Sequence, residues 1–368
     1  MKITLPRETL LDLLSNVIGA VEKRHTTPIL ENVLIQVEQK TLRMTTTDLE
    51  IEMSASTTAS ADQTGEITVP AKKLLDICKA MPKDAMITLS LNQQGRLLLQ
   101  GLRNRFELST LPAIEFPLLD QVPFEQSIEL DEKTLKGLLS KTSFAMANQD
   151  VRYYLNGLLL DIGSDYIAMA ATDGHRLAVS KLTEVSLDNT LTQQIIIPRK
   201  AVLELTRLLT NREQIITLQI SSKHIRLQTD NVQFTSKLID GRYPDYQAAI
   251  PASLAHSLHL DRLQLRDSLS RAAILSNAAF KGVRLTLNNG VMLIQSNNPE
   301  RESAEEELDI NYSGGSLEIG FNVTYLLDAI NHLGGESVFF DLSGSESSTL
   351  LYDPEDEQTR YVVMPIRL

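Results

Sequence analysis

A five-residue stretch contains side chains that could perform acid–base chemistry: Thr172-Asp173-Gly174-His175-Arg176. Asp173 and His175 are two positions apart, so on an extended segment they share a face. An aspartate can orient a histidine so that its imidazole acts as a general base. The stretch therefore raises the hypothesis of a hydrolase or transferase.

The sequence lacks the other residues that such an enzyme needs. Thr172 and Ser180 are nearby hydroxyls, but no G-x-S-x-G elbow, Walker A loop or G-x-G-x-x-G motif is present. With Cys78 as the single cysteine, no internal disulfide or cysteine metal cluster can form. No second histidine stands at an H-x-x-x-H spacing, and the remaining histidines are scattered: His25, His224, His256, His259 and His332. Catalysis is therefore the minor interpretation, and we expect no catalytic residue, metal or cofactor.

The chain repeats one pattern three times. VPAKKLLDICKAM from Val69 matches IPRKAVLELTRLL from Ile197, and GFNVTYLLDAINHL from Gly320 keeps the apolar spacing without the basic pair. An earlier helix also recurs, as LLSNVIGA, LLSKTSFA and SLSRAAIL. The strand that closes each copy is expected to begin with an aromatic residue: Phe106, Phe234 and Tyr361.

These repeats predict an α+β fold of three similar domains, at 1–125, 126–253 and 254–368. Each domain is expected to have two helices packed on antiparallel sheets with one wet face. The acidic run 301–307 is expected to be a solvated loop or an edge strand, where charge discourages pairing.

Charge is divided between the predicted helices and the rest of the chain. The net charge is −12, which argues at first against a nucleic-acid partner. Most of the helical windows are nevertheless basic, and the strands and loops are acidic; the windows are 6–24, 70–82, 133–152, 198–212, 262–281 and 323–333. The residues alone leave two explanations open, a helical surface that faces phosphates or an ordinary scatter of charge on helix faces.

The N-terminus, MKITLPRETL, lacks the apolar stretch of a secretory signal. No apolar run approaches the ~18 to 20 residues that cross a bilayer. We therefore expect a cytoplasmic protein without a membrane partner.

Segments throughout the chain carry a resemblance to one family. They are TDLEIEM (47–53), QDVRYYLNG (149–157), TDGHRLAV (172–179), PRKAV (198–202), SKLIDGRYPDY (236–246), AILSNAAFKGVRL (273–285) and YVVMPIRL (361–368). Over its whole length the chain resembles the bacterial DNA polymerase III β subunits, the sliding clamps. The resemblance implies a head-to-tail homodimer that closes into a ring around duplex DNA, with helices inside and sheets outside. Phosphate contacts would be weak and sequence-independent, and retention would be topological.

The resemblance also implies the site residues. DNA would be contacted by Arg24, Gln149, Tyr153, Tyr154, Arg199 and Lys200. The tyrosines could pack on sugars or stack on unpaired bases, although packing in the core is a comparable explanation for Tyr154. The subunit interface would place Ile274 and Leu275 against Phe106 and Leu108 of the partner; without the family, all four look like core residues.

A hydrophobic cleft between the second and third domains would bind partner peptides. Its expected lining is Leu155, Thr172, Gly174, His175, Arg176, Leu177, Pro244, Ser348, Val362, Val363, Met364, Pro365, Ile366, Arg367 and Leu368. His175 and Arg176 would hydrogen-bond peptide carbonyls, while Asp173 would fix the turn. Gln247-Ala248-Ala249 departs from the basic and β-branched residues of the best-known members, which predicts a shifted peptide preference.

The expected ligand is a segment with Gln, then Leu, then an aromatic residue. It would be carried by the replicative polymerase catalytic subunit, the clamp loader, other polymerases and repair proteins. The sequence thus favours a processivity factor with no activity of its own. A protein-binding scaffold that never encircles DNA is a further alternative.

Overall fold

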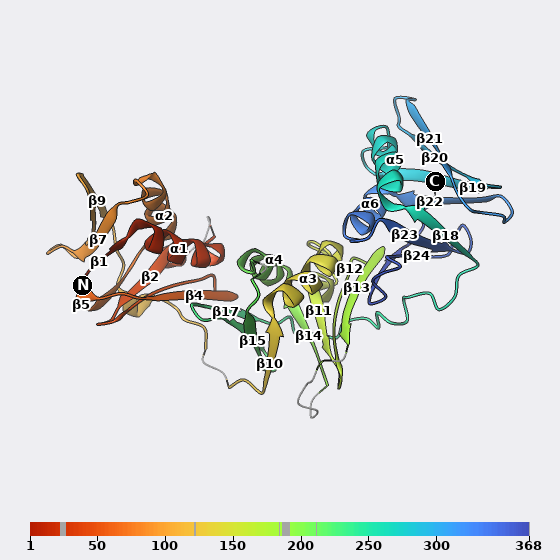
Figure 1. Cartoon of the computed structure of the whole chain (residues 1–368). Coiled ribbons are helices and arrows are strands. Elements are labelled where there is room, and N and C mark those ends of the chain that lie inside the picture. Colours follow the sequence, from red (N-terminus) through yellow and green to blue (C-terminus); the bar gives the residue numbers. More distant parts are fainter. Residues whose placement is uncertain (23–26, 121–122, 184, 186–191, 211, 368) are drawn as a thin grey trace. The chain divides into compact units, whose positions relative to one another are not determined.

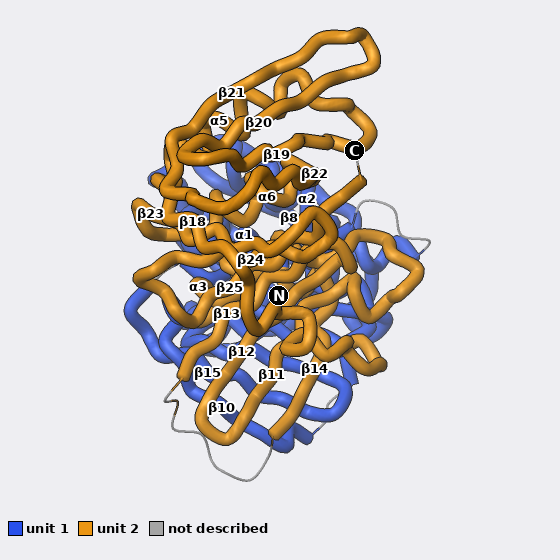
Figure 2. The backbone as a smooth tube through the Cα atoms, turned by 90° about the vertical axis from the view of Figure 1, so that its right-hand side faces the viewer, with its two compact units in different colours: residues 1–134, 203–238 blue, residues 135–202, 239–368 orange. Residues whose placement is uncertain are grey.

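The computed structural model describes residues 1–22, 27–120, 123–183, 185, 192–210 and 212–367. Within them one order of elements occurs three times: a strand, a helix, four strands, a helix and three strands, with one extra short strand in the first copy (Figure 1). This confirms the predicted threefold repeat. The chain divides into two compact units, residues 1–134 with 203–238 and residues 135–202 with 239–368 (Figure 2).

The described residues contain six α-helices, and each begins within one residue of its predicted window. They are α1 (Arg7–Val17), α2 (Ala71–Ala80), α3 (Glu132–Thr142), α4 (Arg199–Leu208), α5 (Arg262–Ile274) and α6 (Val323–Asn331). Several windows extend past the observed helix ends. Arg152 and Lys281, counted among the helical charges, therefore lie in loops.

The first unit contains two antiparallel sheets. The five-stranded sheet has the order β5 (Ala61–Gln63), β1 (Lys2–Pro6), β7 (Met86–Leu91), β8 (Leu97–Gly101) and β9 (Asn104–Leu108). The eight-stranded sheet has the order β10 (Gln126–Asp131), β15 (Ile215–Ile220), β16 (His224–Gln228), β17 (Val232–Lys237), β4 (Ile51–Thr58), β3 (Thr41–Thr47), β2 (Asn32–Val37) and β6 (Gly65–Pro70). Helix α1 packs on α2 and on β4 through buried leucines such as Leu10 and Leu14.

The second unit also contains two antiparallel sheets. Its eight-stranded sheet has the order β14 (Gln193–Pro198), β11 (Gly157–Ile162), β12 (Tyr166–Thr172), β13 (Arg176–Thr183), β25 (Thr359–Val363), β24 (Thr349–Tyr352), β23 (Ser337–Leu342) and β18 (His256–Asp261). Its four-stranded sheet has the order β21 (Ser303–Asp309), β20 (Val291–Asn297), β19 (Gly282–Asn288) and β22 (Leu317–Asn322). Helices α5 and α6 pack together; α5 covers β20 and β21, and α6 contacts β22 and β25.

Each eight-stranded sheet combines strands from two consecutive repeats. β17 pairs with β4, where Phe234 lies opposite Met53, and β13 pairs with β25, where Ala178 lies opposite Tyr361. All four side chains are almost completely buried. Because strands that share a sheet also share a core, the compact units cross the predicted repeat boundaries, and the divisions at 125 and 253 stay predictions.

The closing strands differ in one respect from the expectation. Phe106, Phe234 and Tyr361 are each the third residue of β9, β17 and β25, not the first. The ladder reaches two residues further toward the N-terminus, and Asn104 pairs with Gly101 at the start of β9. The acidic run does form an edge strand, since β21 pairs only with β20 among the strands described. None of the helices in the described ranges is both long and apolar enough to cross a membrane.

Candidate functional site

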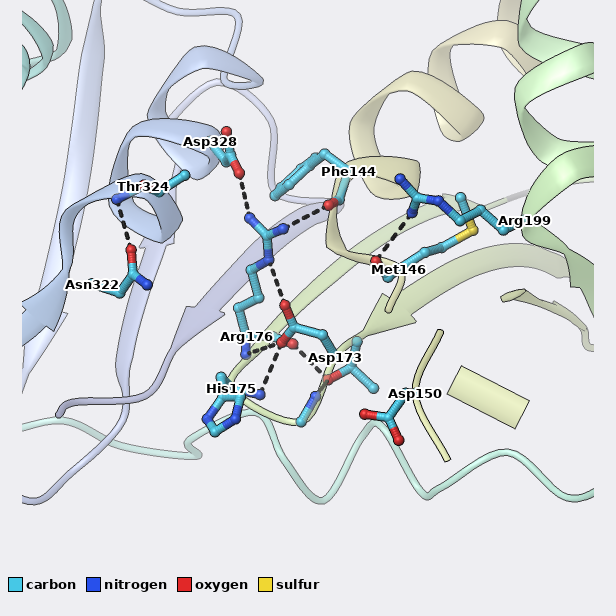
Figure 3. A network of polar contacts seen from close by, with 12 residues as sticks. Phe144, Met146, Asp150, Asp173, His175, Arg176, Arg199, Asn322, Thr324 and Asp328 are labelled. Carbon is cyan, nitrogen blue, oxygen red and sulfur yellow. Dashed lines mark hydrogen bonds and ion pairs between the residues drawn. The ribbon is translucent and has the colours of Figure 1, made fainter. Parts of the chain in front are cut away.

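The Thr172–Arg176 stretch is the turn of the hairpin between β12 and β13. Asp173 Oδ1 accepts hydrogen bonds from the main-chain N–H of His175 (2.9 Å) and of Arg176 (3.1 Å) (Figure 3). Thr172 Oγ1 accepts the N–H of Gly174 at 3.0 Å and donates to the carbonyl of Arg176 at 2.5 Å. Gly174 has φ = 89°, a left-handed conformation that favours glycine. Asp173 thus fixes the turn, as the sequence predicted.

These contacts do not form an acid–base pair. The Asp173 carboxylate binds main-chain N–H groups and the Arg176 guanidinium, and the His175 imidazole is exposed and lies over Tyr325, with ring centroids 6.5 Å apart. A general base would need the carboxylate on the imidazole instead. Within the described part of the chain, no three His, Cys, Asp or Glu side chains are grouped to hold a metal ion.

The Arg176 side chain is enclosed, with 12% of its surface exposed. Nε donates to Asp173 Oδ2 at 3.0 Å, Nη1 to Asp328 Oδ2 at 2.5 Å and Nη2 to the carbonyl of Phe144 at 2.8 Å. Figure 3 shows these three bonds spreading from one guanidinium to three elements. The Arg176 groups expected to bind peptide carbonyls therefore each donate to an acceptor within the chain, whereas the His175 imidazole, the other expected donor, is exposed.

The C-terminal segment lies along the same turn. In the β13–β25 ladder Arg176 pairs with Val363 and Leu177 with Val362. The Met364 N–H donates to the His175 carbonyl at 2.9 Å. The fold thus brings together residues 176 and 363, which the sequence places far apart.

The rest of the C-terminal segment leaves this ladder. Ile366 N–H donates to the carbonyl of Gly320 at 2.8 Å, and half-buried Pro365 lies between Met364 and Ile366. Arg367 is exposed, with Nη2 3.2 Å from Glu346 Oε1. Leu368 lies outside the described residues.

Apolar residues of the predicted cleft join one buried cluster. Leu155, Leu177 and Val362 pack in it with Tyr243 and Tyr246. Tyr243 is buried, which raises the pKa of its phenol, and its oxygen accepts the Thr172 N–H at 3.0 Å.

Other predicted residues border this cluster. Pro244 and Met364 are exposed, Met364 by 45%. Ser348 is half-buried and precedes Thr349, which pairs with Val363. The structure thus gathers buried and exposed apolar groups at the predicted site, and its role in binding stays a prediction.

Residues 247–249, which differ from those of the best-known family members, lie in an exposed turn beside this cluster. The N–H groups of Gln247 and Ala248 donate to Asp245 Oδ1 at 3.1 Å and 3.3 Å. Gln247 Nε2 lies 3.4 Å from the hydroxyl of Tyr246, and Ala249 is exposed. The Ala248 and Ala249 side chains are exposed at this turn, and the shifted peptide preference stays a prediction.

Three of the six predicted DNA contacts, Gln149, Tyr153 and Tyr154, lie in the segment 146–156. Gln149 there is exposed with φ = 59°. Tyr153 is 57% exposed and meets Tyr154 edge-on at 5.7 Å, whereas Tyr154 is half-buried against the cluster. Packing in the core therefore accounts for part of the Tyr154 side chain. It does not account for Tyr153, which is too exposed.

Arg199 holds both ends of this loop. Its main-chain N–H donates to the carbonyl of Asn156 at 3.0 Å, and its Nη1 donates to the carbonyl of Met146 at 3.1 Å (Figure 3). Lys200 follows on α4 and is half-buried, and Arg24 lies outside the described residues.

A second arginine joins the loop to the hairpin turn. Arg152 binds Asp150, with Nη2–Oδ2 at 2.8 Å, and also donates to the carbonyl of Asp173 at 3.1 Å. Hydrogen bonds from Arg152 lower the pKa of Asp150 to about 2. The loop and the turn therefore belong to one polar network.

The predicted interface residues have unequal exposure. Ile274, the last residue of α5, is 76% exposed, and Leu275 is half-buried. Phe106 is half-buried on β9, an edge strand of its sheet, and Leu108 is buried. An isoleucine so exposed is not a core residue.

Sequence reasoning did not identify the partners of Arg176. Asp328 and Tyr325 are spaced i, i+3 on α6, so they share a helix face. Phe144 follows α3 in a short 3-10 turn. Nothing in the local sequence of these three residues links them to the 172–176 turn, so only the tertiary structure shows the contacts.

Comparisons with known proteins agree with this arrangement. Family models of the DNA polymerase III beta subunit match its N-terminal domain at residues 1–120, its central domain at 129–245 and its C-terminal domain at 247–367. The beta sliding clamps of Pseudomonas aeruginosa and Escherichia coli are 47% and 45% identical to the chain, with all of both chains covered. A crystal structure of the Pseudomonas aeruginosa subunit superposes with a TM-score of 0.96 at 47% identity, again over all of both chains. A Bartonella birtlesii sliding clamp bound to griselimycin gives 0.96 at 36% identity with the same coverage. The chain therefore belongs to the DNA polymerase III β subunit family of sliding clamps, which are processivity factors rather than catalytic enzymes.

Proposed function

We propose that two copies of this chain close head to tail into a ring around duplex DNA and tether the replicative polymerase to it. The observation that carries the ring is the 76% exposure of Ile274 at the end of α5, next to a sheet that ends in an unpaired strand among those described. An exposed apolar side chain beside an open sheet edge fits a subunit interface.

Exposed residues near the two edge strands differ in charge. Arg103 and Arg105 lie just before and on β9, where Glu107 is paired with Arg96, and exposed Glu305 and Glu307 lie on β21. Pairing β9 of one subunit with β21 of the other would satisfy both edges, with Ile274 and Leu275 against Phe106 and Leu108. Opposite charges would fix the orientation as head to tail.

Contacts to DNA would be weak and independent of sequence. Basic helices would face the phosphates, and the acidic remainder would repel other DNA. Gln149, Tyr153 and Tyr154 would contact the duplex or unpaired bases from the loop that Arg199 holds, with Arg24 and Lys200 adding positive charge.

The apolar surface around Met364 and Pro244 would bind the short Gln–Leu–aromatic segment of partner proteins. A deformable methionine adapts to different anchors. Related sliding clamps have been crystallised with a ligand and with griselimycin. We extend the partners to the clamp loader, other polymerases and repair proteins, all acting with DNA in the cytoplasm.

The ring is tested first by its mass. Light scattering after size exclusion should give a dimer, and Ile274→Glu should give a monomer because it buries a charge at the join. Ile215→Glu is the matched control, since Ile215 is 65% exposed on β15 and outside the proposed join. A stable wild-type monomer would exclude the ring.

Retention is tested on DNA. Clamp loaded on nicked circular DNA should be released when the circle is cut, because a ring runs off an end. Clamp that stays bound to the linear product would show binding without encirclement, and no retention on either form would favour a scaffold. Met364→Glu should abolish peptide binding, whereas Met86→Glu, at a methionine 51% exposed in the first unit, should not.

A further inference from the structure

We propose that Asp328 of α6 positions the 172–177 turn for peptide binding by holding the guanidinium of Arg176. The inference rests on the proposed peptide site and adds to it one residue outside its expected lining. It also changes the role of Arg176 from a peptide contact to a positioning residue.

The hydrogen bonds of Arg176 join three parts of the fold. Asp173 belongs to the turn itself, Phe144 follows α3, and Asp328 lies on α6, which is in the next repeat (Figure 3). A guanidinium is planar and its N–H groups point in fixed directions, so three acceptors define its position closely. Asp328 is the partner that connects the turn to the third repeat.

Aromatic rings cover the guanidinium as well. The Cζ atom of Arg176 lies 4.6 Å from the ring centre of Tyr325 and 5.4 Å from that of Phe144. Phe144 stacks in turn on His332 at 4.2 Å, and His332 Nδ1 lies 2.7 Å from the carbonyl oxygen of Asp328. Cation–π contacts strengthen when water is excluded, so this packing adds to the ion pair.

Main-chain pairing connects Arg176 to its neighbours at the predicted cleft. Arg176 is the first residue of β13 and pairs with Val363, and the next ladder pair joins Leu177 to Val362. The main-chain bond from Met364 to His175 extends the same ladder. Releasing the Arg176 side chain would therefore loosen the turn at the end of this ladder, where it meets the C-terminal wall of the proposed site.

Enclosure separates this role from direct contact with a peptide. The Arg176 side chain is 12% exposed and that of Asp328 is 34% exposed, so little of the guanidinium is open to a peptide. If Arg176 positions the turn, removing Asp328 should weaken peptide binding although Asp328 touches no peptide. If Arg176 binds the peptide directly, removing Asp328 should leave affinity unchanged or increase it.

The test is a double-mutant cycle on peptide affinity. The probe is a fluorescein-labelled peptide with Gln, Leu and Phe in that order, read by fluorescence anisotropy, with Ala at Leu and Phe as the peptide control. We expect Asp328→Ala to weaken binding by roughly 2- to 30-fold, the range for residues that act through a neighbour. Asp328→Asn keeps an acceptor without the charge and should lie between wild type and Asp328→Ala. The matched control is Asp267→Ala, which removes a carboxylate paired with Arg266 at 2.6 Å on α5.

Positioning of the turn by Arg176 and direct contact of Arg176 with the peptide predict different results in the double-mutant cycle. Positioning predicts that Arg176→Ala and the double variant bind equally, since Asp328 then has nothing to hold. Equal affinity of Asp328→Ala and Asp267→Ala, or additive losses in the double variant, would overturn the inference. Near-ultraviolet circular dichroism checks that each variant is folded. If Asp328→Ala does not fold, the cycle is measured with Asp328→Asn instead. Failure of the wild type to bind the peptide would instead refute the proposed peptide site.

Discussion

His224 makes the stability of the first unit depend on pH. It lies on β16 with 6% of its surface exposed, and neither Nδ1 nor Nε2 has a hydrogen-bond partner among the residues that the structure describes. Its main-chain groups are satisfied, because Ser221 Oγ accepts its N–H at 3.0 Å and its carbonyl accepts the Ser221 N–H at 2.9 Å. The free-energy cost of burying polar atoms without hydrogen bonds is therefore confined to the imidazole nitrogens.

Burial lowers the pKa of His224 from its ordinary value of 6.5, and positive charge on Lys237, Arg226 and Lys223 lowers it further. The Asp120 carboxylate opposes this shift. In the unfolded chain the imidazole takes up a proton as the pH falls through 6.5, whereas the folded imidazole resists it. The contribution of the neutral His224 imidazole to folding stability is therefore fully present above pH 6.5. It is lost as the pH falls toward the lowered pKa of the folded state.

The size of the loss has an upper limit. If the folded imidazole stayed neutral, the free energy of unfolding would fall by about 1.4 kcal/mol between pH 7.5 and 5.5, or about tenfold in an opening equilibrium. His224→Leu should remove this slope. At pH 7.5 it should also stabilise the unit by about 1–3 kcal/mol, because no buried nitrogen is left unpaired.

Hydrogen exchange of the β16 amides measures this locally, as protection factors at pH 7.5 and 5.5. We expect protection in the wild type to fall more than in His224→Leu. His259→Leu, at an exposed histidine on β18, is the matched control and should keep the wild-type slope. Equal slopes in wild type and His224→Leu would refute the reasoning.

Two more predictions follow from burial and backbone geometry. Burial raises the pKa of Cys78 from 9.0 to about 12, so at pH 8 its thiolate should be about a thousandfold scarcer than that of an unburied thiol. Iodoacetamide should therefore label Cys78 only after denaturation. Equal labelling rates in native and denatured protein would contradict this. Gly174→Ala should destabilise the hairpin by about 1–2 kcal/mol, because φ is 89° and the new Cβ would lie 2.8 Å from Nη1 of Arg152. Exchange of the amides at 170–178 should speed up in that variant, with Gly95→Ala (φ = 75°, no atom near the new Cβ) isolating the backbone part, and unchanged exchange would show that the turn tolerates a side chain.

The helices could be predicted because their apolar residues repeat at helical spacing. Their ends could not, since α3 stops at Thr142, where its hydroxyl binds the carbonyl of Leu138 and the chain tightens into a 3-10 turn. Such local bonds compete with the helix without changing the apolar pattern. The apolar pattern likewise does not reveal the two residues of β9 and of β25 that precede the aromatic residue of each strand.

The site could be predicted only in part. Glycine and aspartate at 173–174 indicate a turn from their types alone, and the C-terminal wall was known only through the family resemblance. The pairing of Arg176 with Val363 and with Asp328 joins different repeats, and no local pattern encodes such contacts. Burial of His224 was equally hidden, because its neighbours Lys223 and Arg226 suggest an exposed strand.

The hairpin turn shows why residue types alone misled toward catalysis. A tight turn that holds a buried arginine needs an acceptor for main-chain N–H groups, a residue at positive φ and a carboxylate for the guanidinium. Asp173 and Gly174 meet these needs, and an Asp–His catalytic pair would use the same kind of carboxylate. The distinguishing fact is which hydrogens the carboxylate accepts, and here they come from the main chain of His175 and from Arg176, never from the imidazole. A carboxylate with both oxygens engaged in this way holds a shape, and the proposed peptide site needs a fixed shape at this turn more than it needs a base.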